Sequence, residues 1–167
     1  MKAKPVALWG MMGALVIAVS FIEGLFELPF IPGMKIGISN VVTVAAAMLG
    51  GVWGMLYIVA VKALFALASR GFTAFLLSIT GGLLSGFVTV LLLKMRKKPF
   101  SLVGVSVIGA LFHNGGQLLM ATLLTGTAAL LYYSPVLLGF SLVFGTATGI
   151  VLRVLEPNLK KIKEKRK

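Results

Sequence analysis

Eight polar side chains interrupt the long apolar stretches of this sequence, and their types are those that bind small polar molecules. They comprise one carboxylate, three cations, three amides and one imidazole: Glu23, Lys35, Asn40, Lys62, Arg70, His113, Asn114 and Gln117. Cations and N–H groups bind anions, and the carboxylate tunes that charge or binds an amine. Inside a bilayer each charge costs at least ~2.5–3.5 kcal/mol on insertion scales, so each needs a partner or a ligand.

The chain contains few side chains of the types that take part in catalysis. There is no cysteine and no aspartate, and the four acids are Glu23, Glu27, Glu156 and Glu164. Thiolate metal sites are therefore excluded, and very few side chains are left for a carboxylate-rich magnesium site. The single histidine has no acid assigned near it, and the sequence contains no P-loop. We expect no metal, no cofactor and no catalytic residue.

The elements that position the polar side chains are long apolar runs. Hydrophobic residues make up 59% of the 167 residues and charged residues 12%, against about 25% charged in soluble domains. Polar, glycine or proline breaks divide the runs into six predicted helices: 5–26, 34–49, 52–69, 72–93, 101–124 and 132–155. The pattern predicts an all-α integral membrane protein of about six transmembrane helices over 1–156, followed by a basic cytoplasmic tail over 157–167. The first run lacks a convincing cleavage site before Glu23, which favours a retained helix over a signal peptide.

The basic residues predict the topology of this bundle. If the N-terminus is cytoplasmic and the helices alternate, all but three of the 16 basic residues fall on the cytoplasmic side. The exceptions are Lys35, Lys62 and Arg70. The positive-inside rule thus predicts that both termini lie on the cytoplasmic side of a bacterial cytoplasmic membrane. This distribution explains the net charge of +12 without nucleic acid, and the basic tail is suited to anionic lipid.

Three predicted helices carry small residues at a spacing of four. They are Gly10, Ala14 and Ala18; Ser78, Gly82 and Gly86; and Ser141, Gly145 and Gly149. Small residues at this spacing mark close helix contacts in lipid. Such contacts can lie inside the bundle, or they can dock a partner membrane subunit on the first helix. Spacing alone does not separate the two.

The predicted topology places the charged members of the polar set in the outer half of the membrane. His113 and Gln117 share one face of a helix near mid-membrane, with Asn114 adjacent to that face. Three helices also begin on the outer side, where their positive dipole ends favour an anion. We therefore expect an outward-opening cavity for a small anionic solute.

Structural roles remain open for several of the same residues. Lys62 could pair with Glu23 to fix helix packing. Lys35 and Arg70 could be interfacial anchors that snorkel to the headgroups. His113 could be a hydrogen-bonded packing residue.

Three segments of the sequence resemble a known family of small membrane proteins. They are 32–40 (PGMKIGISN), 78–85 (SITGGLLS) and 104–117 (GVSVIGALFHNGGQ). In combination they resemble the heptaprenyl diphosphate synthase component I, or Gx transporter, family over nearly the whole chain. The resemblance leads us to expect arginine where this chain has Lys62, which keeps the charge but loses the planar fork of a guanidinium.

That family is in turn similar to the substrate-binding S components of energy-coupling factor (ECF) importers. These are six-helix proteins that capture a vitamin-like solute and work with a transmembrane coupling protein and two cytoplasmic ATPases. The resemblance implies that Gly10, Ala14 and Ala18 contact the coupling protein. It also implies a substrate-binding role in import. The identity of the solute stays open, because a vitamin, a flavin-like molecule and a short isoprenoid diphosphate all fit a partly apolar pocket with a cationic end.

Two other functions remain open. One is a non-catalytic membrane subunit for heptaprenyl diphosphate or quinone synthesis, since prenyl chain elongation resembling known synthases needs aspartate-rich motifs that this chain lacks. The other is a purely structural membrane subunit without a ligand.

Overall fold

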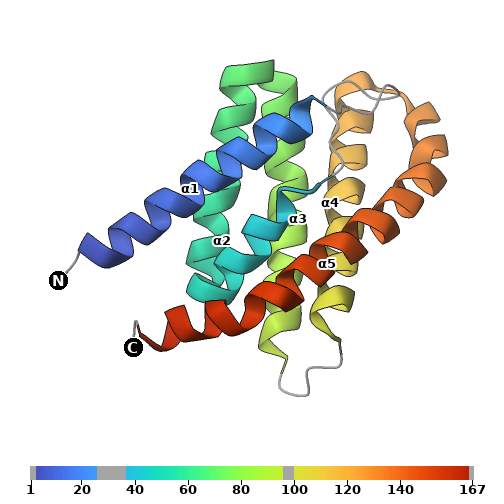
Figure 1. The fold of residues 1–167 in the computed structure, drawn as a ribbon. Helices are drawn as coiled ribbons and strands as arrows, with labels where there is room; N and C mark the ends of the chain where they lie inside the picture. The colour runs from blue at the N-terminus through green and yellow to red at the C-terminus, as the bar shows by residue number, and fades with distance from the viewer. Residues whose placement is uncertain (1–2, 26–36, 96–99, 166–167) are drawn as a thin grey trace.

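The computed structural model describes residues 3–25, 37–95 and 100–165, and this part of the chain is helical without any strand. The helices are α1 (Ala3–Gly24), α2 (Asn40–Arg70), α3 (Phe72–Lys94), α4 (Leu102–Thr125), the short 3₁₀ helix η1 (Ala128–Tyr133) and α5 (Ser134–Glu164). Figure 1 shows them as one bundle in which α3 lies between α2 and α4. The predicted all-α fold is confirmed.

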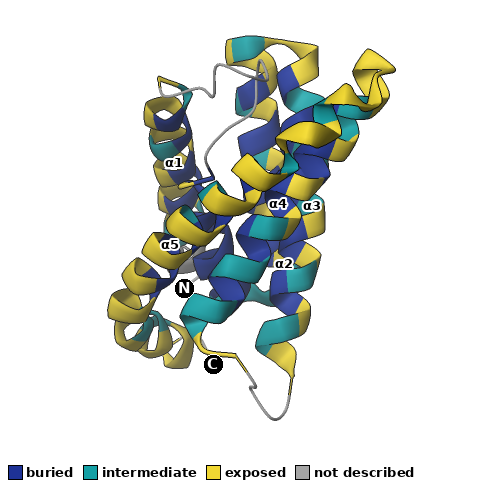
Figure 2. Cartoon of the chain, turned by 90° about the vertical axis from the view of Figure 1, so that its right-hand side faces the viewer, coloured by how far each residue is buried: buried dark blue, intermediate teal, exposed yellow. Residues whose placement is uncertain are grey.

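Five of these helices are long and apolar enough to cross a membrane. No more than half of the most apolar window of each helix is buried inside the protein. Figure 2 shows exposed residues along the outward sides of the helices, and they include large apolar side chains such as Met11, Trp53 and Leu91. In water such surface would cost about 25 cal/mol per Å² of apolar area, whereas lipid removes that cost. The chain is therefore a multi-pass membrane protein.

A sharp reversal divides α2 into two helical segments at Gly51. This glycine has φ +61° and ψ −139°, outside the helical region. A Cβ on Gly54 would lie 2.4 Å from the carbonyl oxygen of Ala46, a proximity that a continuous helix does not give residues eight apart. Figure 1 accordingly shows the chain turning back on itself here. The predicted break at 50–51 is confirmed.

The first segment of α2 is shorter than we expected. It begins at Asn40, not at 34, because Gly37 adopts φ +94° and residues 38 and 39 form a turn. Residues 34–36 lie outside the described part of the chain. At ~1.5 Å per residue, segment 40–50 spans ~16 Å, about half of a ~30 Å bilayer core. This segment alone cannot cross a membrane.

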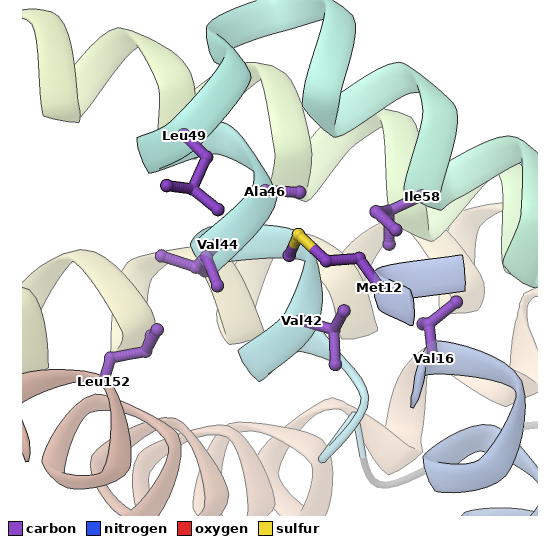
Figure 3. Packing of buried hydrophobic residues seen from close by; sticks show 9 residues of the cluster. Met12, Val16, Val42, Val44, Ala46, Leu49, Ile58 and Leu152 are labelled. Carbon is purple, nitrogen blue, oxygen red and sulfur yellow. The ribbon is translucent and has the colours of Figure 1, made fainter. Parts of the chain in front are cut away.

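The last helix also differs from its predicted range. We expected it to end at 155, but α5 continues through Pro157 to Glu164. Beyond the proline, Leu159 and Ile162 pack against an apolar cluster that joins α1, both segments of α2, and α5. Figure 3 shows Met12, Val42 and Leu152 in this cluster. Burial of these apolar residues stabilises the continuation of α5 despite the hydrogen bond that proline removes.

The two ends of the bundle differ in charge. At one end α3 finishes at Lys94, α4 begins, and α5 finishes among Lys160, Lys161 and Lys163. We call this the basic end; Figure 1 shows both chain termini toward it. At the opposite end α1, α2 and α4 finish.

We predict that Gly149→Ala separates α4 from α5. A Cβ at Gly149 would lie 2.4 Å from Val103 Cα, which is backbone and cannot swing away. Overpacking of this kind costs ~1–3 kcal/mol, so we expect the free energy of unfolding in detergent to fall by that amount. The matched control is Gly139→Ala on the same helix, where the added Cβ has no described atom within 4 Å apart from the adjacent backbone of its own helix. Equal stability of the two variants in circular-dichroism unfolding would contradict this packing.

Candidate functional site

Glu23 holds the turn that precedes α2. Its side chain comes from the last turn of α1 and is 1% exposed. One carboxylate oxygen accepts hydrogen bonds from the backbone N–H groups of Gly37 and Ile38, the latter at 2.8 Å. The other oxygen accepts from the Ser39 hydroxyl at 2.7 Å. The positive N-terminal end of α2 is therefore already matched by an anion supplied by the chain itself.

Lys62 approaches the same turn from the second segment of α2. It is 2% exposed, and its Nζ donates to Asn40 Oδ1 at 3.1 Å. Within the described chain Lys62 therefore bonds to the first residue of α2 and not to the Glu23 carboxylate, although the Glu23 charge still acts on it. The Asn40 Nδ2 amide group is buried, and no described residue accepts from it. Glu23, Asn40 and Lys62 form one connected cluster around the turn.

His113 brings α4 to this cluster. The ring is fully buried, and its Cδ2 atom would lie 3.6 Å from a Cβ on Gly37. On its other side the ring approaches Gly81 of α3, where a Cβ would meet His113 Nδ1 at 3.1 Å and Gln117 Cγ at 2.9 Å. The missing side chain of Gly81 thus lets α3 approach the His113 and Gln117 face of α4 closely. The shared face predicted for these two residues is directed at α3.

Asn114 points in another direction. It donates to Ser141 Oγ at 2.8 Å, and that hydroxyl donates to the Leu137 carbonyl oxygen at 2.7 Å. These bonds fasten α4 to α5. Arg70 is half-buried at the end of α2, and Lys35 lies outside the described residues. The structure thus gathers Glu23, Asn40, Lys62 and His113 at one place and places Asn114 on a separate helix contact.

Several site features were not anticipated from the sequence. Ser39 and the backbone N–H groups of residues 37 and 38 are partners of Glu23, and the glycine at 37 was the available clue to a tight turn. Below Asn40 lies a void of about 10 Å³ lined by hydroxyl groups. They belong to Thr43, Ser85, Thr89, Ser106 and Thr148. This volume is at the lower limit for one water molecule, so the void does not hold a solute.

The chemistry available at the cluster is hydrogen bonding and charge matching. Buried atoms without a described partner include Asn40 Nδ2, a donor in the cluster, and two acceptors on α4, Asn114 Oδ1 and Gln117 Oε1. Such atoms normally find partners, because an unmet polar group costs ~1–3 kcal/mol. Among the described residues, no group of three or more His or acidic side chains could hold a metal.

We predict that Glu23→Gln strongly destabilises the bundle. The amide keeps one acceptor oxygen, but its NH₂ group faces donor groups of the turn and cannot accept from them. The substitution also removes the negative charge near the start of α2. We expect the free energy of unfolding to fall by ~2–4 kcal/mol. The control is Glu156→Gln, which breaks an exposed ion pair with Lys160 (2.7 Å) worth ~0.3–0.5 kcal/mol. Thermal unfolding in detergent measures both, and similar losses would show that the turn does not depend on the Glu23 charge.

The site residues fall inside a segment that known proteins share. The family model described as heptaprenyl diphosphate synthase component I matches residues 12–155. No curated protein and no solved structure matches the chain. The matched range contains the Glu23, Asn40 and Lys62 cluster, the face of His113 and Gln117, and most of every helix. The chain therefore belongs to the heptaprenyl diphosphate synthase component I family.

Proposed function

We propose that this protein is the substrate-binding membrane component of an ECF-type importer. Its termini would lie in the cytoplasm of a bacterium, and it would capture a small solute at the end of the bundle opposite the basic end. One observation carries this proposal: a stripe of small residues on α1 faces away from the rest of the bundle.

The contrast between the three small-residue stripes supports a docking surface on α1. The stripe on α3 is buried, with Gly82 against Val59 and Gly86 against Met55. The stripe on α5 is likewise buried against α4. On α1, however, the residues are all exposed: Gly10, Ala14 and Ala18. In lipid, small residues lower the barrier to close helix approach, so an exposed stripe suits a second transmembrane protein.

The opposite face of α1 explains why this stripe remains outside. Met12, Val16 and Ser20, also four apart, are buried, and α1 contacts α2 alone among the described helices. An α-helix turns about 100° per residue, so positions two apart lie on nearly opposite faces. The bundle therefore uses one face of α1 and leaves the small-residue face for a partner. That partner would be the coupling protein, and ATP use would belong to its ATPases.

The solute site that we propose is the polar set around the start of α2. Lys62 and Asn40, with Arg70 at the end of α2, would hold an anionic group. Lys35, which precedes the turn in the sequence, is the remaining cation of the proposed set. His113, Asn114 and Gln117 would orient the solute by hydrogen bonds, and Glu23 would tune the charge. Because Glu23 occupies the N-terminus of α2, entry of a solute would displace the turn at 37–39. A vitamin or an isoprenoid precursor fits this chemistry.

A second function is favoured by the family description. A non-catalytic membrane subunit of heptaprenyl diphosphate synthesis would need no aspartate-rich motif, and this chain contains no aspartate. Its partner would be a soluble synthase, which would dock at the basic end. A soluble protein has no access to a small-residue stripe that faces lipid, so the α1 stripe favours the importer.

We predict that Gly10→Leu removes a membrane partner without unfolding the protein. The leucine meets no described atom within 4 Å of its Cβ, so the bundle remains stable, but it blocks close helix approach. Affinity purification of the tagged chain from its native membrane, followed by mass spectrometry, measures the partner. The control is Gly139→Leu, an equal change on the exposed face of α5. Loss of a coupling protein and ATPases from Gly10→Leu alone supports the importer; a soluble prenyl synthase retained by both variants supports the second function.

We also predict that Lys62→Ala abolishes solute binding and leaves a folded bundle. Native mass spectrometry of the gently purified protein would identify a retained small molecule, and the variant should lose it. Lys161→Ala, an exposed lysine at the basic end, serves as the control. Retention of the molecule by Lys62→Ala would remove Lys62 from the site. Loss of the folded state would assign Lys62 to helix packing.

A further inference from the structure

A cavity lies at the basic end, and none of its lining residues belongs to the Glu23 cluster. It measures about 520 Å³, within the range of ~300–1,000 Å³ that small-molecule pockets occupy. Both segments of α2 meet at its edge through Gly51, and α3, α4 and α5 supply the rest of its lining. We call it the basic-end cavity.

The inner wall of the basic-end cavity is apolar. Ala47, Val90 and Val105 are buried there, and Leu93 and Leu102 are half-buried nearer the rim. The wall contains no buried charge among its described residues, so it offers hydrocarbon contacts alone. A hydrocarbon chain that packs against this wall is removed from water, which stabilises the complex by ~0.8 kcal/mol of free energy per buried CH₂ group.

The rim of the same cavity is basic. Four cationic side chains and one carboxylate line it: Lys94, Arg153, Glu156, Lys160 and Lys163. The fold uses some of them. Lys160 pairs with Glu156, and Lys163 donates to the Met48 carbonyl oxygen at 2.8 Å.

Lys94 and Arg153, by contrast, are not used by the fold in this way. Both are exposed at the rim, on α3 and α5 respectively, and neither forms a hydrogen bond or ion pair within the described chain. An ammonium and a guanidinium that face one hollow from two helices form a favourable site for a phosphate group.

Because the basic-end cavity has an apolar inner wall and a basic rim, we propose that it binds an amphiphile with a phosphate or diphosphate head and a hydrocarbon chain. The head lies between Lys94 and Arg153, and the chain lies along Ala47, Val90 and Val105. This site is separate from the solute site at the Glu23 cluster and does not depend on the importer function. Both membrane phospholipids and isoprenoid phosphates have this chemistry.

The experiment uses the full chain in an uncharged detergent, with farnesyl diphosphate as the probe and calorimetry as the readout. We expect Lys94→Gln with Arg153→Gln to weaken its binding about tenfold or more, since two charge-assisted contacts are lost. The matched control, Lys161→Gln with Lys165→Gln, removes the same charge from exposed positions that do not line the cavity. Its affinity should equal that of the unchanged protein.

A third variant tests the apolar wall. Leu102→Trp narrows the cavity from a half-buried position and should weaken farnesyl diphosphate binding while leaving the weak binding of inorganic diphosphate unchanged. The proposal fails if both double variants lose affinity equally. It also fails if inorganic diphosphate or farnesol binds as tightly as farnesyl diphosphate, because the site requires both head and chain.

A competition arm distinguishes the two sources of the ligand. The protein in nanodiscs of phosphatidylglycerol is compared with the protein in phosphatidylcholine. Weaker farnesyl diphosphate binding in phosphatidylglycerol assigns the cavity to an anionic membrane lipid. Equal binding in the two bilayers assigns it to an isoprenoid phosphate. Absence of binding in both bilayers and in detergent overturns the proposal.

Discussion

The hydrogen bonds from the turn at 37–39 to the Glu23 carboxylate are the interaction on which the rest of the bundle depends. A turn buried inside a protein in lipid has N–H groups that water cannot reach, and each unmet group costs several kcal/mol. Glu23 accepts from the N–H groups of Gly37 and Ile38, in the turn that precedes α2, and from the Ser39 hydroxyl. The same bonds join the end of α1 to the start of α2, which are remote in sequence. The carboxylate thus has a structural role that is independent of any ligand.

A half-length helix becomes stable through this interaction. Segment 40–50 begins within the bundle, where α1 and α4 contact α2. The chain then reverses at Gly51, which brings the second segment of α2 back alongside the first. Lys62 donates to Asn40, the residue that follows this turn, and its positive charge lies close enough to interact with the Glu23 carboxylate. Removing the Glu23 charge would leave the Lys62 charge buried without an anion, which is costly. Without Lys62, the carboxylate keeps its three hydrogen bonds from the turn. Discontinuous helices commonly form solute sites in transporters, because their ends present N–H and carbonyl groups that bind charged groups.

Much of this architecture could be predicted from the sequence, because apolar runs and glycine or proline breaks fix where helices run in lipid. The break at 50–51 and the convergence of Glu23, Asn40 and Lys62 followed from that reasoning. The start of α2 did not, because hydropathy does not distinguish a helix from a buried turn whose N–H groups are bonded to a distant carboxylate. The continuation of α5 through Pro157 also depends on tertiary contacts, those of Leu159 and Ile162. Spacing identified the three small-residue stripes, but only packing revealed that the α1 stripe faces outward.

The charged side chains at the two ends of the bundle differ in burial and pairing, and this difference suits the two ends to different roles. Around the turn at 37–39, the charges of Glu23 and Lys62 are buried and matched by the chain itself, so a solute that binds there must exchange existing bonds for new ones. Such an exchange would couple binding to movement of α2, as the proposed import function would need. At the basic end, Lys94 and Arg153 are exposed beside a preformed cavity, so the proposed anionic head would bind without breaking a contact. The buried cluster is therefore suited to a conformational switch, and the basic end to a ligand that stays in place.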